Sequence, residues 1–226
     1  MKYSAKILFL GRKNDFFSKK IAALLKKNFS RVTLIYSKTH HEKLDSKYLN
    51  WSGDFIFSFR NYIIIPEKLL KKVNIAAINF HPGSPKYRGI GCLNYAVLNK
   101  EKTYGVTAHL IDKKIDNGKI LKIKKFSINR KKSLDKILTQ THKELYNLVI
   151  YFINLIIANK FNLKKMVKNN QKNIWTDKIY TKNDLEKLYN IDPRITKIKF
   201  NDILRATIYK KFKPHVNLFG KQFKLK

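Results

Sequence analysis

The chain has 226 residues, 44% of them hydrophobic, which is enough to bury the core of one large α/β domain or of one domain with an appendage. Its single cysteine, Cys92, excludes an internal disulfide, and a reducing cytoplasm is the expected compartment. The longest apolar run, residues 147–158, is too short to span a bilayer, and the apolar start is too short for a secretory signal. We therefore expect no membrane partner.

The formal net charge of +34 at pH 7 would ordinarily suggest a nucleic-acid or anionic-membrane partner. The cations are mostly lysines, however, and they are spread over the whole chain. Nucleic-acid-binding surfaces instead concentrate arginine and exposed aromatic residues on one face. We interpret the charge as a composition bias and expect no specific nucleic-acid partner, although the charge should attract anionic substrates.

The first half of the chain alternates short apolar runs with helical patterns. Strands are predicted over 6–11, 31–37, 54–59 and 76–80, and helices over 15–27 and 66–73. This alternation predicts an α/β fold with a Rossmann-like, mostly parallel sheet and helices on both faces. No G-x-G-x-x-G follows the first strand, so the sequence does not indicate a dinucleotide site.

The second half predicts a helix over 92–100, strands over 104–112 and 118–128, and a long helix over 133–160. The polar segment 164–173 breaks the periodicity and is interpreted as a linker. A short helix capped by Thr181 and a β-hairpin turning near Gly220 follow. We therefore predict a main domain over 1–163 and a C-terminal extension over 164–226.

A pair of polar residues ends the strand over 76–80. Asn79 and His81 lie two apart, so they project from the same face of a strand, while Phe80 projects from the other. Ligands of doubly wound sheets bind beyond the carboxyl ends of strands, where His81 lies. An amide that stabilises an oxyanion beside an imidazole that moves a proton suits acyl transfer. Asp116 is the best candidate to orient His81, while simple packing of the Asn-x-His pair is the alternative.

Four short motifs surround this pair in a fixed order. They are NFHP at 79–82, PKYRG at 85–89, YGVT at 104–107 and IDNG at 115–118. In order and spacing they resemble the 10-formyltetrahydrofolate-dependent formyltransferase family over about residues 3 to 130. The resemblance implies a Rossmann-like catalytic domain that passes a formyl group from the folate to an amine.

The resemblance also implies roles for three residues and requires no metal. Asn79 would polarise the formyl oxygen, His81 would accept the amine proton, and Asp116 would orient His81. Folate in this family is held largely by backbone groups, which leaves little side-chain signature. Phe59 and Tyr62 could equally be core aromatics. The residues implied to bind the folate are Phe59, Arg60, Asn61, Tyr62, Ile63, Asp112 and Ile115.

The length of the chain discriminates among acceptors in this family. A methionyl-tRNA enzyme would need a further C-terminal barrel, and a glycinamide ribonucleotide enzyme a Gly-rich opening that this chain lacks. The loop 90–95 and the ending over 205–221 look most like sugar nucleotide N-formyltransferases. The implied acceptor is a nucleotide-linked amino-dideoxysugar of the dTDP-4-amino-4,6-dideoxyglucose type, used for O-antigen or another surface polysaccharide. The tRNA and ribonucleotide enzymes stay as alternatives.

A nucleotide diphosphate requires cationic and backbone donors near the strand exits. A solvated surface charge is the alternative for each candidate. The candidate substrate-binding residues are Arg12, Asn14, Lys86, Tyr87 and Arg88.

Two further expectations concern assembly and a competing class of function. The hairpin alternates apolar residues that a small tail cannot bury alone, and the resemblance favours a homodimer through it. An inactive scaffold that binds nucleic acid is the competing hypothesis. Retention of Asn79, His81 and Asp116 argues against it.

Overall fold

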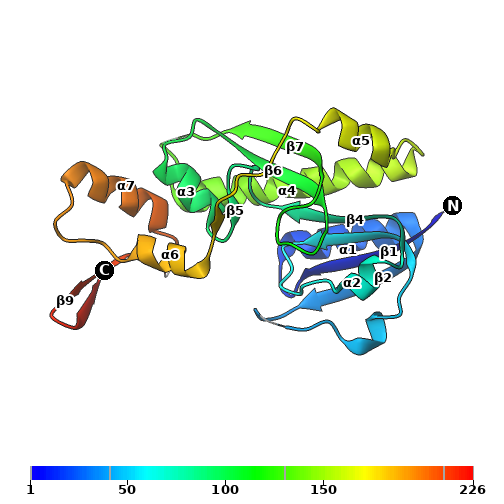
Figure 1. Ribbon diagram of the computed structural model, residues 1–226, viewed down its shortest axis with the longest axis horizontal. Coiled ribbons are helices and arrows are strands. Elements are labelled where there is room, and N and C mark those ends of the chain that lie inside the picture. Colours follow the sequence, from blue (N-terminus) through cyan, green and yellow to red (C-terminus); the bar gives the residue numbers. More distant parts are fainter. Residues whose placement is uncertain (1, 41, 130, 211, 226) are drawn as a thin grey trace. The chain divides into compact units, whose positions relative to one another are not determined.

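The computed structural model describes residues 2–40, 42–129, 131–210 and 212–225. The chain forms two compact units that interleave in sequence (Figure 1). The first unit comprises Met1–Pro82, Val106–Lys124 and His142–Ile174, and the second comprises Gly83–Gly105, Lys125–Thr141 and Trp175–Lys226. Each unit combines three separate segments of the sequence. The predicted boundary between residues 163 and 164 stays a prediction.

A central sheet of six strands, counted over the described residues, has the order β2-β1-β3-β4-β6-β7. Neighbouring strands are parallel from β2 through β1 and β3 to β4, and β6 is antiparallel to β4. This arrangement confirms the predicted Rossmann-like, mostly parallel α/β fold. The strands are β1 (Tyr3–Arg12), β2 (Phe29–Ser37), β3 (Gly53–Phe59), β4 (Val73–His81), β6 (Thr103–Leu110) and β7 (Ile120–Ser127).

One face of the first unit's sheet packs against helix α4 (Leu134–Ile157) through aromatic rings. The ring of Phe80 on β4 lies 5.4 Å from that of Phe57 on β3 and 5.5 Å from that of Phe152 on α4, measured between centroids. Because side chains alternate along a strand, Asn79 and His81 project from the opposite face, as predicted. Helix α1 (Phe16–Asn28) begins after Asp15, whose carboxylate accepts from the backbone N–H of Ser18.

The opposite face has its own apolar cluster, in which Leu8 and Leu10 of β1 and Ile56 of β3 are fully buried. Helix α2 (Glu67–Leu70) contributes Leu69 to this cluster. This helix is shorter than the predicted range 66–73, because β4 already begins at Val73. No described helix is both long enough and apolar enough to cross a membrane.

The second unit has a separate core that includes Tyr87, Tyr95 and Ala206. The predicted cap at Thr181 is confirmed, because Thr181 and Asp184 form a reciprocal capping box at the start of α6. The predicted hairpin is also confirmed, and Gly220 adopts a φ of +74° in its turn. The elements of this unit are β5 (Arg88–Gly89), α3 (Cys92–Leu98), β8 (Ile179–Tyr180), α6 (Lys182–Tyr189), α7 (Lys197–Thr207), β9 (His215–Leu218) and β10 (Lys221–Lys224).

The predicted linker over 164–173 is wrong for most of its length. Helix α5 (Leu163–Asn169) occupies it, because Asn162 caps the backbone N–H of Lys165 and Met166 is buried. A polar sequence can hold a short helix when one apolar residue anchors it and a cap satisfies its first amides. Three further elements were not predicted: helix α7, the β5–β8 pair, and the short 3₁₀ helix η1 (Ser46–Tyr48).

Candidate active site

The carboxyl end of β4 brings the predicted triad together inside the first unit. Nδ1 of His81 lies 3.2 Å from Oδ2 of Asp116. Nδ2 of Asn79 donates to Oδ1 of the same carboxylate at 3.2 Å. His81 is 3% and Asp116 8% exposed, so the pair is shielded from bulk water. An amide, an imidazole and a carboxylate are therefore in direct contact, and their catalytic roles stay a prediction.

Asp116 reaches β4 because the loop between β6 and β7 folds back sharply. Asp116 itself has a left-handed φ of +46°, a region that Asp and Asn tolerate better than most residues. Two residues later, a Cβ added at Gly118 would lie 1.8 Å from the backbone oxygen of Leu110. Only glycine permits this close approach of the loop to the strand. The D-x-G spacing of the sequence thus has a geometric cause.

The charge state of Asp116 follows from its neighbours. Burial by itself raises the pKa of this carboxyl, but the charge of His81 and the close contacts with the His81 and His109 imidazoles outweigh it. The net pKa of Asp116 lies well below its ordinary value. Asp116 is therefore an anion at neutral pH and can stabilise a proton on the imidazole beside it.

Two residues that the sequence reasoning did not select also contact the triad. His109 of β6 is opposite Asn79 in the ladder, and its Nε2 lies 3.1 Å from Nδ2 of Asn79. Ser58 of β3 is the partner of Asn79 on the other side and donates from Oγ to Asn79 Oδ1 at 2.9 Å. Both lie in register with Asn79, so strand pairing would have revealed them, but pairing cannot be read from a single strand.

The residues predicted to hold the folate divide into core and surface positions. Phe59 and Ile63 are buried, so the reading of Phe59 as a core aromatic fits its place. Arg60 forms an ion pair with Asp15, and Asn61 donates to Ser58 Oγ at 2.6 Å. The remaining three are Tyr62, which is partly buried, and the exposed loop residues Asp112 and Ile115.

Arg12, predicted to bind substrate, lies beside the predicted folate loop. Its guanidinium stacks 4.0 Å from the centroid of the Tyr62 ring, and its Nε donates to the backbone oxygen of Arg60 at 3.1 Å. Asn14 is exposed and has a left-handed φ of +61°. Arg12, predicted to bind the nucleotide sugar, therefore contacts Arg60 and Tyr62, which were predicted to bind the folate.

The other three predicted substrate-binding residues belong to the second unit. Lys86 Nζ pairs with Glu101 at 2.6 Å, and the hydroxyl of the buried Tyr87 donates to the same carboxylate at 2.8 Å. Arg88 is 5% exposed and donates to the backbone oxygen of Thr176 at 2.8 Å. These contacts give Tyr87 and Arg88 a structural role, and substrate binding by the three residues stays a prediction.

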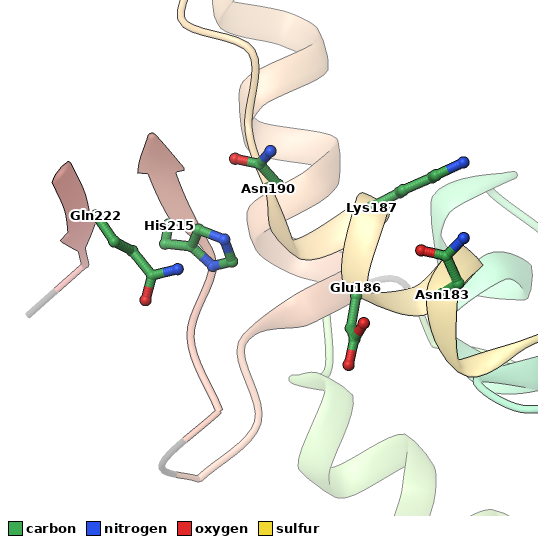
Figure 2. Close-up of a pocket in the computed structure, with 6 residues that line it drawn as sticks. All are labelled: Asn183, Glu186, Lys187, Asn190, His215 and Gln222. Atoms are coloured by element: carbon green, nitrogen blue, oxygen red, sulfur yellow. The ribbon is translucent and has the colours of Figure 1, made fainter. Parts of the chain in front are cut away.

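A cavity of about 460 Å³ in the second unit lies between α6 and the terminal hairpin (Figure 2). None of the predicted site residues lines it. The residues that line it come from α6, the position after it, and both hairpin strands: Asn183, Glu186, Lys187, Asn190, His215 and Gln222. Within the described part of the chain, no group of three or more His, Cys, Asp or Glu residues could hold a metal ion.

Residues 6–153 match the family model described as Formyl transferase. The chain belongs to the formyl transferase family. The bifunctional polymyxin resistance protein ArnA of Wigglesworthia glossinidia brevipalpis is 36% identical over 168 residues, 74% of this chain and 22% of the relative. A methionyl-tRNA formyltransferase of Mycoplasmopsis pulmonis is 33% identical over 48% of this chain and 38% of the relative. The chain therefore spans well under half the length of these two relatives.

Solved structures share the fold over almost the whole chain. A 4-N formyltransferase from Francisella tularensis has a TM-score of 0.72 at 22% identity and covers 97% of this chain and 96% of its own. An N-formyltransferase from Helicobacter canadensis, in complex with folinic acid and dTDP-3-aminofucose, has a TM-score of 0.73 at 21% identity. That match covers 96% of this chain and 85% of the Helicobacter chain.

Proposed function

We propose that the protein transfers a formyl group from 10-formyltetrahydrofolate to the amine of a nucleotide-linked amino-dideoxysugar. The observation that carries the proposal is the contact among Asn79, His81 and Asp116 at the carboxyl end of β4, in a chain of the formyl transferase family. The general rule for open α/β sheets places ligands at this edge.

His81 is the group that moves protons in this mechanism. As the amine nitrogen bonds to the formyl carbon, the imidazole of His81 takes a proton from that nitrogen. The proton then passes to the departing folate nitrogen as its bond to the formyl carbon breaks. Asp116, held as a carboxylate, keeps Nδ1 of His81 protonated and stabilises the transient imidazolium at 3.2 Å.

Asn79 is the group that stabilises negative charge on the formyl oxygen. In the structure its Nδ2 has acceptors on both Asp116 and His109. We infer that the N–H of Asn79 that donates to Oδ1 of Asp116 donates instead to the formyl oxygen when the substrates are bound. A hydrogen-bond donor at a developing oxyanion contributes about 100-fold to 1000-fold in rate.

The loops of the first unit fit the folate that supplies the formyl group. Ile64, after β3, is 75% exposed, and Ile115, after β6, is 62% exposed. Exposed apolar side chains on loops at the strand ends suit a flat ring system, while nearby backbone groups can supply its hydrogen bonds. The folate-binding assignments of Arg60, Asn61, Tyr62 and Asp112 stay part of this proposal.

Support for a nucleotide-sugar acceptor comes from the coverage of the fold. The Francisella and Helicobacter enzymes match 97% and 96% of this chain, and the matches cover 96% and 85% of their own chains. The Helicobacter structure contains a dTDP-linked amino sugar. The proposed contacts to the diphosphate stay those named from the sequence: Arg12, Asn14, Lys86, Tyr87 and Arg88. Use of the product in O-antigen synthesis follows as a further proposal.

The proposed assembly is a homodimer in the cytoplasm. On the hairpin, Phe219 is fully exposed and Phe223 is 56% exposed. Such an apolar surface is stabilised when a second copy covers it. The thiol of Cys92 is buried and forms no disulfide, which suits a reducing compartment. Gel filtration of the chain with and without residues 213–226 tests the dimer, and an unchanged elution volume for the two chains contradicts it.

The deciding experiment offers 10-formyltetrahydrofolate to the purified protein with a panel of acceptors. The panel contains dTDP-, UDP- and GDP-linked 3-amino and 4-amino sugars, glycinamide ribonucleotide and methionyl-tRNA. The expected result is a mass gain of one formyl group on one amino-sugar nucleotide. Transfer only to methionyl-tRNA or to the ribonucleotide would refute the acceptor class. Absence of transfer to every acceptor, with salt-resistant DNA binding, would favour an inactive binding scaffold.

A further inference from the structure

A hydrogen-bond chain in the first unit runs from a backbone donor to a backbone acceptor through the side chain of Asn79. Its first step joins the backbone N–H of Ile63 to Oδ1 of Asn61 at 2.6 Å. Its last step joins Nδ1 of His109 to the backbone oxygen of Leu110 at 2.7 Å. Between these ends lie Ser58 and Asn79.

The first end fixes the direction of the chain. A backbone N–H can only donate, so the atom of Asn61 that faces Ile63 must be its oxygen. The nitrogen of the same carboxamide then faces Ser58 Oγ, 2.6 Å away, and donates to it. Ser58 has one hydroxyl hydrogen, which is left to donate to Asn79 Oδ1 at 2.9 Å.

The other end requires the same direction. A backbone carbonyl can only accept, so the hydrogen-bond network assigns a hydrogen to Nδ1 of His109. In the neutral imidazole Nε2 is then an acceptor, and it lies 3.1 Å from Nδ2 of Asn79. The two ends agree that the oxygen of Asn79 faces Ser58 and its nitrogen faces His109 and Asp116.

This agreement matters because a carboxamide has two nearly isosteric orientations. With its nitrogen toward Asp116, Asn79 presents a donor to the reacting carbonyl. With the amide turned over, it would present an oxygen, which repels developing negative charge. Ser58 is 4% and His109 2% exposed, so water does not compete strongly for these contacts.

We propose that Asn61, Ser58 and His109 are positioning residues that hold the carboxamide of Asn79 with its nitrogen toward Asp116 and the reacting carbonyl. The proposal rests on the proposed formyl transfer for its kinetic consequence, but the orientation itself can be observed without turnover. The chain also links the loop after β3, predicted to hold the folate, to the amide that acts on the formyl group.

Two variants test the chain from the Ser58 side. Ser58→Ala removes the donor to Asn79. Asn61→Asp keeps the acceptor for the Ile63 N–H but cannot donate, so the Ser58 hydrogen turns toward position 61 and leaves Asn79 Oδ1 without a donor. Each variant should lower kcat about tenfold or more, and Ser58→Ala, which removes no proposed folate contact, should change the KM values much less. Asn50→Asp, an exposed position whose side chain accepts from Lys72, adds the same charge and should leave both constants unchanged.

The position of His109 allows rescue by a conservative variant. His109→Gln places an amide oxygen near the position of Nε2 and retains an acceptor for Asn79, whereas His109→Leu retains none. The expected order of kcat is wild type, then His109→Gln, then His109→Leu. Equal losses in the two variants would show that the imidazole only fills space and would overturn its positioning role.

The side-chain amide signals of Asn79 provide a readout that does not depend on activity. They are observed in protein labelled with ¹⁵N-asparagine and identified by their absence in Asn79→Ala. Ser58→Ala and Asn61→Asp should shift these signals, and Asn50→Asp should not. Unchanged signals in both variants would refute the hydrogen-bond chain through Asn79. Shifted signals with unchanged kcat would refute its positioning role. If Ser58→Ala does not fold, Asn61→Asp decides. A wild type without formyl transfer would refute the proposed function, while the signals would still decide on the chain.

Discussion

Replacing Asp116 by Asn removes one charge from the candidate site with little change in shape. The left-handed φ of +46° at this position is favourable for Asn, so the substitution adds no backbone strain. The fold should therefore survive, and circular dichroism melting should show a cooperative transition. Any loss of activity can then be assigned to the missing carboxylate.

The size of the loss follows from the distance between the two charges. Nδ1 of His81 and Oδ2 of Asp116 are 3.2 Å apart and both side chains are buried. Charge centres about 4 Å apart interact by about 4 kcal/mol at an effective dielectric constant of about 20. The neutral amide retains about 1 kcal/mol as a hydrogen bond. The net loss of about 3 kcal/mol corresponds to a fall in kcat of about 100-fold or more.

The assay is steady-state formyl transfer across the pH range. In Asp116→Asn the acid limb of the pH–rate profile should move to lower pH, because the imidazolium loses its carboxylate partner. Asp177→Asn is the matched control, since Asp177 is exposed in the second unit and should show wild-type rates. A folded Asp116→Asn protein with kcat within threefold of wild type (about 0.7 kcal/mol) would refute the assignment of Asp116.

Three further outcomes are expected. His81→Asn should leave the fold intact and lower turnover by about 100-fold to 10,000-fold, and near-normal turnover would remove the mechanism. Gly118→Ala should lower the free energy of unfolding, measured in urea, by about 2 kcal/mol or more, because its Cβ would lie 1.8 Å from the Leu110 oxygen. Gly220→Ala, whose Cβ would have no atom within 4 Å, should lower it by only about 1 kcal/mol. Equal losses in the two variants would contradict the role of the close contact at Gly118. Because its folded pKa is depressed, Asp116 contributes stability that is present above its unfolded pKa of about 3.9 and lost as the pH falls through the folded value. The difference in unfolding free energy between wild type and Asp116→Asn should therefore narrow below about pH 4, and a constant difference would be evidence against the shift.

The sequence by itself determined the fold class and the core of the candidate site. Alternating apolar runs and helical patterns locate the strands, because burial requires a period of two or 3.6 residues. The same alternation places Asn79 and His81 on one face and Phe80 on the other, and the structure shows both. The helix cap at Thr181 and the turn at Gly220 were also predicted from the sequence, because each depends on a few adjacent residues.

Only the tertiary structure decided which residues surround Asn79. Ser58 and His109 reach it through neighbouring strands, and strand register depends on contacts between distant segments. Long-range packing likewise placed Arg12 on Tyr62 and turned Arg88 toward Thr176. The segment predicted as a linker forms helix α5, which the burial of Met166 stabilises. The sequence pattern indicates the local structure and chemistry of each residue, whereas the tertiary structure determines which distant residues it contacts.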